Sequence, residues 1–187
     1  LRGAGHDFGG DARSDLNETQ PVRIALPTGM QVGSVNVYLF TDPEPVLVDA
    51  GIKSAESWEA LQEGLAKHGL TVLDLSRVII THAHVDHDGQ AGTIVANSDA
   101  DVWISDAGAP WLKGMDERQE SRMSYYREVF LPATGLPAST NEVIANGLKG
   151  MADQRDPLPP ERICSFRRDG VLQMGGRAWQ VLFTPGH

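Results

Sequence analysis

A short, wholly apolar segment near the middle of the chain runs directly into a loop that holds three of the six histidines. Val78-Ile79-Ile80 shows no polar alternation, and such a continuous apolar run is typical of a strand that is buried inside a sheet. The loop after it, residues 81–89, reads THAHVDHDG. The chain must therefore fold around a buried strand whose far end carries a cluster of imidazoles.

The spacing of these side chains suits a site for divalent metal ions. Residues two apart in an extended segment point to the same side, so His82 and His84 can reach one metal. If the chain turns into a helix after Val85, Asp86 and His87 swing toward a neighbouring position. Imidazole and carboxylate ligands together favour a borderline ion such as zinc. The alternative is an exposed polar loop whose histidines bind nothing, but three histidines and a carboxylate after a buried strand make that interpretation the weaker one.

The remaining pattern predicts a layered α/β fold with strands before and between helices. Ser54 can cap a helix that Gly69 ends, and Gly175-Gly176 joins the last two strands as a hairpin. The predicted strands are residues 22–26, 31–40, 46–48, 75–81, 101–105, 163–166, 171–174 and 178–183, and the predicted helices are residues 54–69, 90–97, 107–113, 116–131 and 140–154, with Pro132 ending the fourth.

We divide the chain into two parts. Residues 1–20, which are rich in Gly, Asp, Asn and Ser, are expected to form a flexible N-terminal arm. Residues 21–187 are expected to form one domain, in which residues 113–160 are a helical insertion.

Composition excludes several classes of protein. The chain carries 25 Asp and Glu against 16 Lys and Arg, a net charge of −9, which disfavours nucleic acid as a partner because such surfaces are usually basic. A single cysteine, Cys164, rules out an intramolecular disulfide framework. No apolar run approaches the roughly 20 residues of a membrane helix, so we expect no membrane partner. The cellular compartment stays open, with the cytoplasm favoured.

Three segments together resemble the metallo-β-lactamase superfamily: VLVDAG at residues 46–51, THAHVDHDG at residues 81–89 and TPGH at residues 184–187. The resemblance spans about residues 32–187, and its HxHxDH form is similar to the glyoxalase II and lactonase branches. It implies an αββα sandwich with metal ions at one edge of two facing sheets. It also implies a third imidazole, His187, at the end of the chain.

By position, the resemblance assigns ligands to two metal sites. The first site takes His82, His84 and His187, and the second takes Asp86 and His87. Asp49 corresponds to a carboxylate that supports a ligand from behind rather than binding the metal. An equally simple interpretation of Asp49 is a turn residue ahead of Gly51.

The resemblance also implies the chemistry. One or two zinc ions per chain, with iron or manganese as alternatives, would lower the pKa of a bound water to about 7. The resulting hydroxide would attack a carbonyl, with Asp86 as the catalytic residue that orients the water and moves its proton. We expect a small ester, thioester or lactone as substrate. The alternatives within the superfamily are a β-lactamase, a phosphodiesterase or nuclease, and an iron-dependent persulfide dioxygenase.

Two further expectations concern the substrate and the missing part of the fold. The helical insertion could cover the metal edge as a lid, and Tyr125 is the candidate that contacts substrate there. Family members continue past TPGH with an Asp that bridges two metals and a final His. We therefore expect this sequence to be an N-terminal part of a longer fold, or one chain of a split protein whose partner supplies the remainder. A chain that stays incomplete would be a metal-binding fragment without activity.

Overall fold

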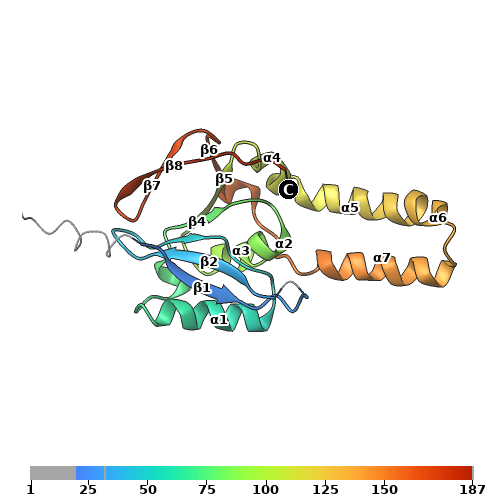
Figure 1. Cartoon of the computed structure of the whole chain (residues 1–187), viewed down its shortest axis with the longest axis horizontal. Helices are drawn as coiled ribbons and strands as arrows, with labels where there is room; N and C mark the ends of the chain where they lie inside the picture. Colours follow the sequence, from blue (N-terminus) through green and yellow to red (C-terminus); the bar gives the residue numbers. More distant parts are fainter. Residues whose placement is uncertain (1–19, 32, 187) are drawn as a thin grey trace, which may run out of the picture.

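The computed structural model describes residues 20–31 and 33–186, so the expected arm at residues 1–20 lies outside the described residues except for Gln20. A six-stranded sheet in the strand order β1-β2-β3-β4-β5-β6 forms its centre (Figure 1). The first three strands pair antiparallel and the pairs from β3 to β6 are parallel. The strands are β1 (Val22–Leu26), β2 (Val35–Phe40), β3 (Val46–Val48), β4 (Arg77–Ile80), β5 (Asp101–Ser105) and β6 (Ile163–Phe166).

Helices cover one face of this sheet. Helix α1 (Ala55–Ala66) begins at Ser54, whose Oγ accepts a hydrogen bond from Ser57 N at 3.1 Å, as the sequence predicts. Leu61 and Leu65 of α1 are fully buried against the strands, and each contributes about 1.5–3 kcal/mol by leaving water. The same apolar core takes in α3 (Ala91–Ala96) and α4 (Ala109–Lys113). The 3₁₀ turns Val72–Asp74 and Pro160–Arg162 precede β4 and β6.

The other face of the sheet carries a smaller apolar cluster. Phe40, Val46 and Ile79 are buried there, and Leu172 and Met174 pack against them from a two-stranded sheet. That sheet consists of β7 (Val171–Met174) and β8 (Arg177–Gln180). Its two-residue turn has positive φ angles of 58° and 67° at its glycines, which only glycine adopts without strain. The predicted hairpin is therefore confirmed, but the last strand ends at Gln180 and not at residue 183.

A pair of helices projects from the side of the sheet. Helices α5 (Met115–Tyr125) and α7 (Ala138–Ala152) lie side by side, joined through a π-helical turn at Tyr126–Phe130 and the short α6 (Leu131–Ala133) (Figure 1). We call residues 115–152 the helical hairpin. The prediction that Pro132 ends the first helix was wrong. Leu131 N donates to Tyr126 O five residues back, and this wider turn lets the helix continue through α6 although proline has no N–H to donate.

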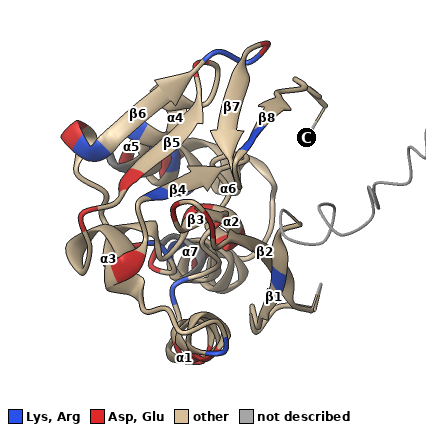
Figure 2. Cartoon of the chain, turned by 90° about the vertical axis from the view of Figure 1, so that its left-hand side faces the viewer, with Lys and Arg blue, Asp and Glu red and all other residues tan. Residues whose placement is uncertain are grey.

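The layered α/β fold class is confirmed, with a central sheet, helices on one face and a second small sheet on the other. In the ribbon of Figure 2, the lysine and arginine positions are spread over several elements and alternate with aspartate and glutamate positions. Within the described ranges, no helix is both long enough and apolar enough to cross a membrane.

Candidate metal centre

The His-rich loop leaves the carboxyl end of β4 and folds at once into a single helical turn, α2 (Val85–Asp88). His84 is extended and precedes this turn, and its carbonyl accepts hydrogen bonds from the N–H groups of His87 and Asp88 at 2.8 and 2.9 Å. The change from strand to helix brings three imidazoles together. The ring centroid of His82 lies 4.7 Å from that of His84 and 4.2 Å from that of His87.

Asp49 connects this loop to the neighbouring strand β3. Its backbone has a φ of 62°, in the left-handed region that few residues other than glycine adopt. The carboxylate, which is almost fully buried, accepts hydrogen bonds from Thr81 N at 2.8 Å and from Thr81 Oγ1 at 3.0 Å. Asp49 therefore holds the first residue of the loop in place.

The same carboxylate also fixes the imidazole of His87. His87 Nδ1 lies 2.8 Å from Asp49 Oδ2, and because an ionised carboxylate can only accept, Nδ1 must donate. This leaves the Nε2 side of the ring facing Asp86, whose Oδ2 is 3.5 Å away. Burial alone would lower the pKa of His87, but the hydrogen bond to Asp49 and the negative charges of Asp49, Asp86 and Asp88 raise it overall.

Thr81 fixes the orientation of a second imidazole. Its Oγ1 lies 3.0 Å from His82 Nδ1 as well as 3.0 Å from the carboxylate of Asp49. Since the hydroxyl has one proton, which it gives to the carboxylate, Nδ1 of His82 donates to the hydroxyl and its lone pair lies on Nε2. The chain Asp49–Thr81–His82 thus sets the tautomer of one candidate ligand, and Asp49 sets that of His87 directly.

Asp88 ends the loop in a buried ion pair that the sequence did not reveal. Arg155 Nε donates to Asp88 Oδ1 at 2.7 Å, and an N–H of the same guanidinium reaches Ala83 O at 3.3 Å. The side chain of Asp88 is fully buried. Burial raises the pKa of Asp88 to about 6, which outweighs the opposing effect of the Arg155 charge. Arg155 lies 67 residues after its partner, and no motif surrounds it.

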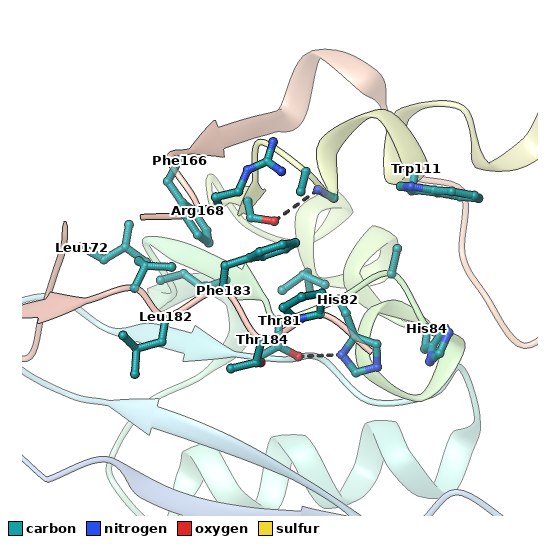
Figure 3. A pocket seen from close by; sticks show the side chains of 18 of the residues that line it. Thr81, His82, His84, Trp111, Phe166, Arg168, Leu172, Leu182, Phe183 and Thr184 are labelled. Atoms are coloured by element: carbon teal, nitrogen blue, oxygen red, sulfur yellow. Dashed lines mark hydrogen bonds between the residues drawn. The ribbon is translucent and has the colours of Figure 1, made fainter. Parts of the chain in front are cut away.

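An open hollow of about 850 Å³ extends from His82 and His84 over the carboxyl ends of β4, β5 and β6 (Figure 3). His82 and His84 lie at one end of it, and Trp111, Phe166 and Phe183 contribute aromatic walls. Residues 184–186, which lead into the expected ligand His187, line the same hollow as His82 and His84. His187 itself lies outside the described residues.

Tyr125 is not among the residues that line this hollow. Its side chain is 54% exposed on α5 and contacts the ring of Tyr126 edge-on, with the centroids 6.2 Å apart. The aromatic residue that extends from the helices into the hollow is Trp111 of α4, with the guanidinium of Arg118 at 4.3 Å from its ring centroid. The substrate-binding role expected for Tyr125 stays a prediction.

The donor set suits a divalent ion in its chemistry, but the described residues hold only part of each expected ligand set. The first set has His82 and His84 here and needs His187, while the second has Asp86 and His87 alone. Accordingly, no three His, Cys, Asp or Glu side chains in residues 20–31 and 33–186 are grouped to hold one ion. Imidazoles whose Nδ1 atoms are held by Thr81 and Asp49, together with a carboxylate, are nevertheless ligands that zinc prefers.

A family model described as the metallo-beta-lactamase superfamily matches residues 30–187. The chain belongs to this superfamily. The matched range contains the VLVDAG segment at residues 46–51, the His-rich loop and the final TPGH segment, so the resemblance expected from these motifs is confirmed.

Relatives and solved structures give the same family. The chain is 28% identical over 168 residues to the probable metallo-hydrolase YqjP of Bacillus subtilis (strain 168), covering 89% of this chain and 50% of that protein. It is 25% identical over 163 residues to the probable metallo-hydrolase YflN of the same organism, covering 85% and 55%. The chain therefore spans about half the length of the curated relatives it matches.

Among solved structures, a metallo-beta-lactamase family protein from Thermus thermophilus superimposes with a TM-score of 0.64 at 22% identity, over 89% of this chain and 52% of that one. MEM-A1, a subclass B3 metallo-beta-lactamase from a soil metagenome library, gives a TM-score of 0.58 at 19% identity, over 91% and 52%. At this identity the two structures establish the fold alone.

Proposed function

We propose that the chain is the metal-binding part of a metal-dependent hydrolase that acts on a small ester, thioester or lactone. The observation that carries the proposal is the arrangement of Asp49, Thr81 and the three imidazoles. A buried carboxylate that orients ligand histidines from behind is the usual support of a functional metal site. An exposed loop whose histidines bind nothing would not need a buried carboxylate that bonds Thr81 and His87 from behind.

His82 and His84 would hold one ion together with His187, and Asp86 with His87 would contribute to a second. Zinc is the ion that this ligand set favours, with iron or manganese as alternatives. When bound, such an ion supplies Lewis-acid activation of water and of the substrate carbonyl.

The residues of the chain have separate tasks in this proposal. Asp49 holds His87 by Nδ1 so that Nε2 faces the reaction centre. Asp86, whose side chain is 29% exposed, can accept a proton from the attacking water at its carboxylate and pass it to the leaving group. The aromatic walls of the hollow suit the apolar part of a small acyl group.

The probable metallo-hydrolases YqjP and YflN support hydrolysis as the reaction class. The net charge of −9 weighs against a nuclease or phosphodiesterase, because a polyanionic substrate would be repelled. A β-lactamase and a persulfide dioxygenase share the proposed ligands, and experiment must separate them from an esterase.

The test measures the metal content of the intact protein and its turnover of a p-nitrophenyl ester, a glutathione thioester and an aliphatic lactone. We expect one or two zinc ions per chain and hydrolysis that a chelator abolishes and zinc restores. Cleavage of a β-lactam or a phosphodiester in place of these substrates would overturn the substrate class. Iron-dependent oxygen consumption with a persulfide would overturn hydrolysis itself.

A further inference from the structure

The five residues that follow the helical hairpin run back along the His-rich loop. We call residues 153–157 the strap. Gln154 O accepts a hydrogen bond from Lys53 N at 3.0 Å, and Asp156 N donates to Gly89 O at 2.6 Å. Figure 1 shows the chain leaving α7 beside α2 before it reaches β6. The strap thus lies between the segment after β3 and the end of the loop.

Two glycines show how closely the strap is packed. A Cβ at Gly89 would lie 2.7 Å from Gln154 O, and a Cβ at Gly92 would lie 2.2 Å from Pro157 O. Both obstacles are backbone atoms, which cannot turn aside as a side chain can. The strap therefore contacts α2 and α3 at backbone distance, and its position relative to the loop is fixed.

Arg155 projects from the strap and holds the loop at both ends. Its Nε donates to Asp88 Oδ1 at 2.7 Å, and its other donor reaches Ala83 O at 3.3 Å. Ala83 lies between two candidate ligands, and Asp88 directly follows a third. A planar guanidinium with donors in fixed directions can hold two such acceptors at a set separation, which a lysine ammonium cannot do in the same way.

The ion pair is largely shielded from water, so solvent cannot compensate either charge if its partner is removed. The Arg155 side chain is 14% exposed and that of Asp88 is fully buried. Asp88 Oδ2 has no hydrogen-bond partner among the residues that the structure describes, which leaves Arg155 as the charged group that compensates this buried carboxylate. Removal of one member of a buried pair leaves the other charge uncompensated.

We propose that Arg155 is a positioning residue of the metal centre, which holds residues 83–88 in the conformation that presents the candidate ligands. The description of residues 83–88 as a metal loop rests on the proposed function. The ordering of the loop by Arg155 does not depend on it. Because Arg155 follows α7 closely, its side chain couples the helical hairpin to the loop, in addition to the backbone hydrogen bond from Asp156 N to Gly89 O.

The chain offers a matched control in a second arginine with the same kind of contacts. Arg162 Nε donates to Asp101 Oδ1 at 2.7 Å, and its other donor reaches Ala100 O at 2.6 Å. This pair joins the turn before β6 to the start of β5 and does not touch the His-rich loop. Arg162→Gln therefore removes an arginine–aspartate pair of the same bond length, which is more exposed at 30% and 44%, without altering the proposed positioning.

The experiment compares Arg155→Gln, Arg155→Lys and Arg162→Gln in the intact protein. Hydrogen exchange is measured first on the metal-free protein, at the amides of His84, His87 and Asp88. Zinc affinity is then measured by competition with a chelator, and the coordination by the electronic spectrum of the cobalt(II) form. We expect Arg155→Gln to speed exchange at these amides and to weaken zinc binding about 10–100-fold. Arg155→Lys should show smaller changes in amide exchange and in zinc affinity than Arg155→Gln. Arg162→Gln should change neither quantity.

Wild-type exchange and wild-type zinc affinity in Arg155→Gln would overturn the proposal. If Arg155→Gln does not fold, Asp88→Asn removes the same ion pair at almost constant side-chain volume, and unchanged exchange in that variant would overturn it equally. Absence of zinc binding by the wild-type protein would overturn the proposed function, while the exchange comparison would still decide the role of Arg155.

Discussion

The His-rich loop and the helical hairpin are held by different kinds of contact. Residues 81–88 are tied to two distant parts of the chain, at Asp49 and Ala50 on one side and at Arg155 on the other. The main contacts of α5, α6 and α7 are with one another and with the π-helical turn between them. The hairpin also leaves large apolar side chains exposed, namely Tyr125, Val129, Phe130, Leu136 and Val143.

The difference shows that contacts with distant segments of the chain fix the geometry of the candidate site. A loop of nine residues cannot hold three imidazoles by local interactions alone, because fixing each residue costs about 1–2 kcal/mol of conformational entropy. The contacts to β3 and to the strap offset that cost. The hairpin forms from local helical contacts and needs little from the sheet, so substitutions in the two regions should have very different effects.

The largest effect is expected when a candidate metal ligand is removed from the His-rich loop. We expect His84→Ala to lose most of its bound metal and its hydrolytic activity, because one of the proposed first-site imidazoles is gone. Metal content by mass spectrometry and turnover of the ester panel check this. His68→Ala, an exposed histidine beyond the end of α1, is the control and should retain both. Full metal occupancy with normal turnover in His84→Ala would show that the ligand assignment is wrong.

Loss of the Asp49 carboxylate should weaken the hydrogen bonds that hold Thr81 and His87 without removing a candidate metal ligand. Asn also tolerates a positive φ, so Asp49→Asn isolates the charge from the backbone conformation. We expect zinc affinity to fall about 10–100-fold. The free energy of unfolding should fall by about 1–3 kcal/mol, since Thr81 and His87 lose their charged acceptor. Chelator competition and urea denaturation measure the two effects, and Asp99→Asn at an exposed position is the control. Equal zinc affinity in the two variants would contradict the supporting role of Asp49.

A glycine-to-alanine substitution should lower the stability of the protein near the loop and raise it in the hairpin. Gly92→Ala forces a Cβ to within 2.2 Å of Pro157 O, so we expect a loss of about 1–3 kcal/mol in stability. Gly147→Ala in α7 meets nothing within 4 Å and should stabilise the protein by about 0.5–1 kcal/mol through helix propensity. Thermal and urea unfolding of the two variants provide the comparison. A stabilised Gly92→Ala would mean that the strap does not pack on α3 as described.

The smallest expected effect concerns substrate preference. Trp111 lines the hollow and Tyr125 does not, so we expect Trp111→Ala to raise KM for apolar acyl substrates several-fold, which is worth about 1 kcal/mol or less. Tyr125→Ala tests the prediction from sequence that the hairpin forms a lid. Metal content should not change in Trp111→Ala or in Tyr125→Ala. A change of preference in Tyr125→Ala, with none in Trp111→Ala, would assign the substrate contact to the hairpin.

Much of the fold was predictable because it depends on local pattern. The continuous apolar run before Thr81, the alternation in the second strand and the Gly175-Gly176 turn each specify an element without reference to distant residues. The two helices of the hairpin were also predicted, at residues 116–131 and 140–154 of the expected insertion. The prediction failed at Pro132, since a π-helical turn places the proline where its missing N–H does no harm, and at the last strand, which ends at Gln180.

The candidate site also has one part that local sequence specifies and another that depends on distant residues. The sequence alone determined which side chains gather after β4, because the strand, its spacing of histidines and the turn at Val85 are all contained in a dozen residues. The resemblance pointed to Asp49 as a supporting carboxylate, but only the tertiary structure decided which residues it bonds and what else holds the loop. Asp49 reaches Thr81 across 32 residues, and Arg155 reaches Asp88 across 67. An arginine in a connector after a helix carries no signal of its partner, because the pairing is created by the packing of the strap against α2 and α3 and by no local pattern.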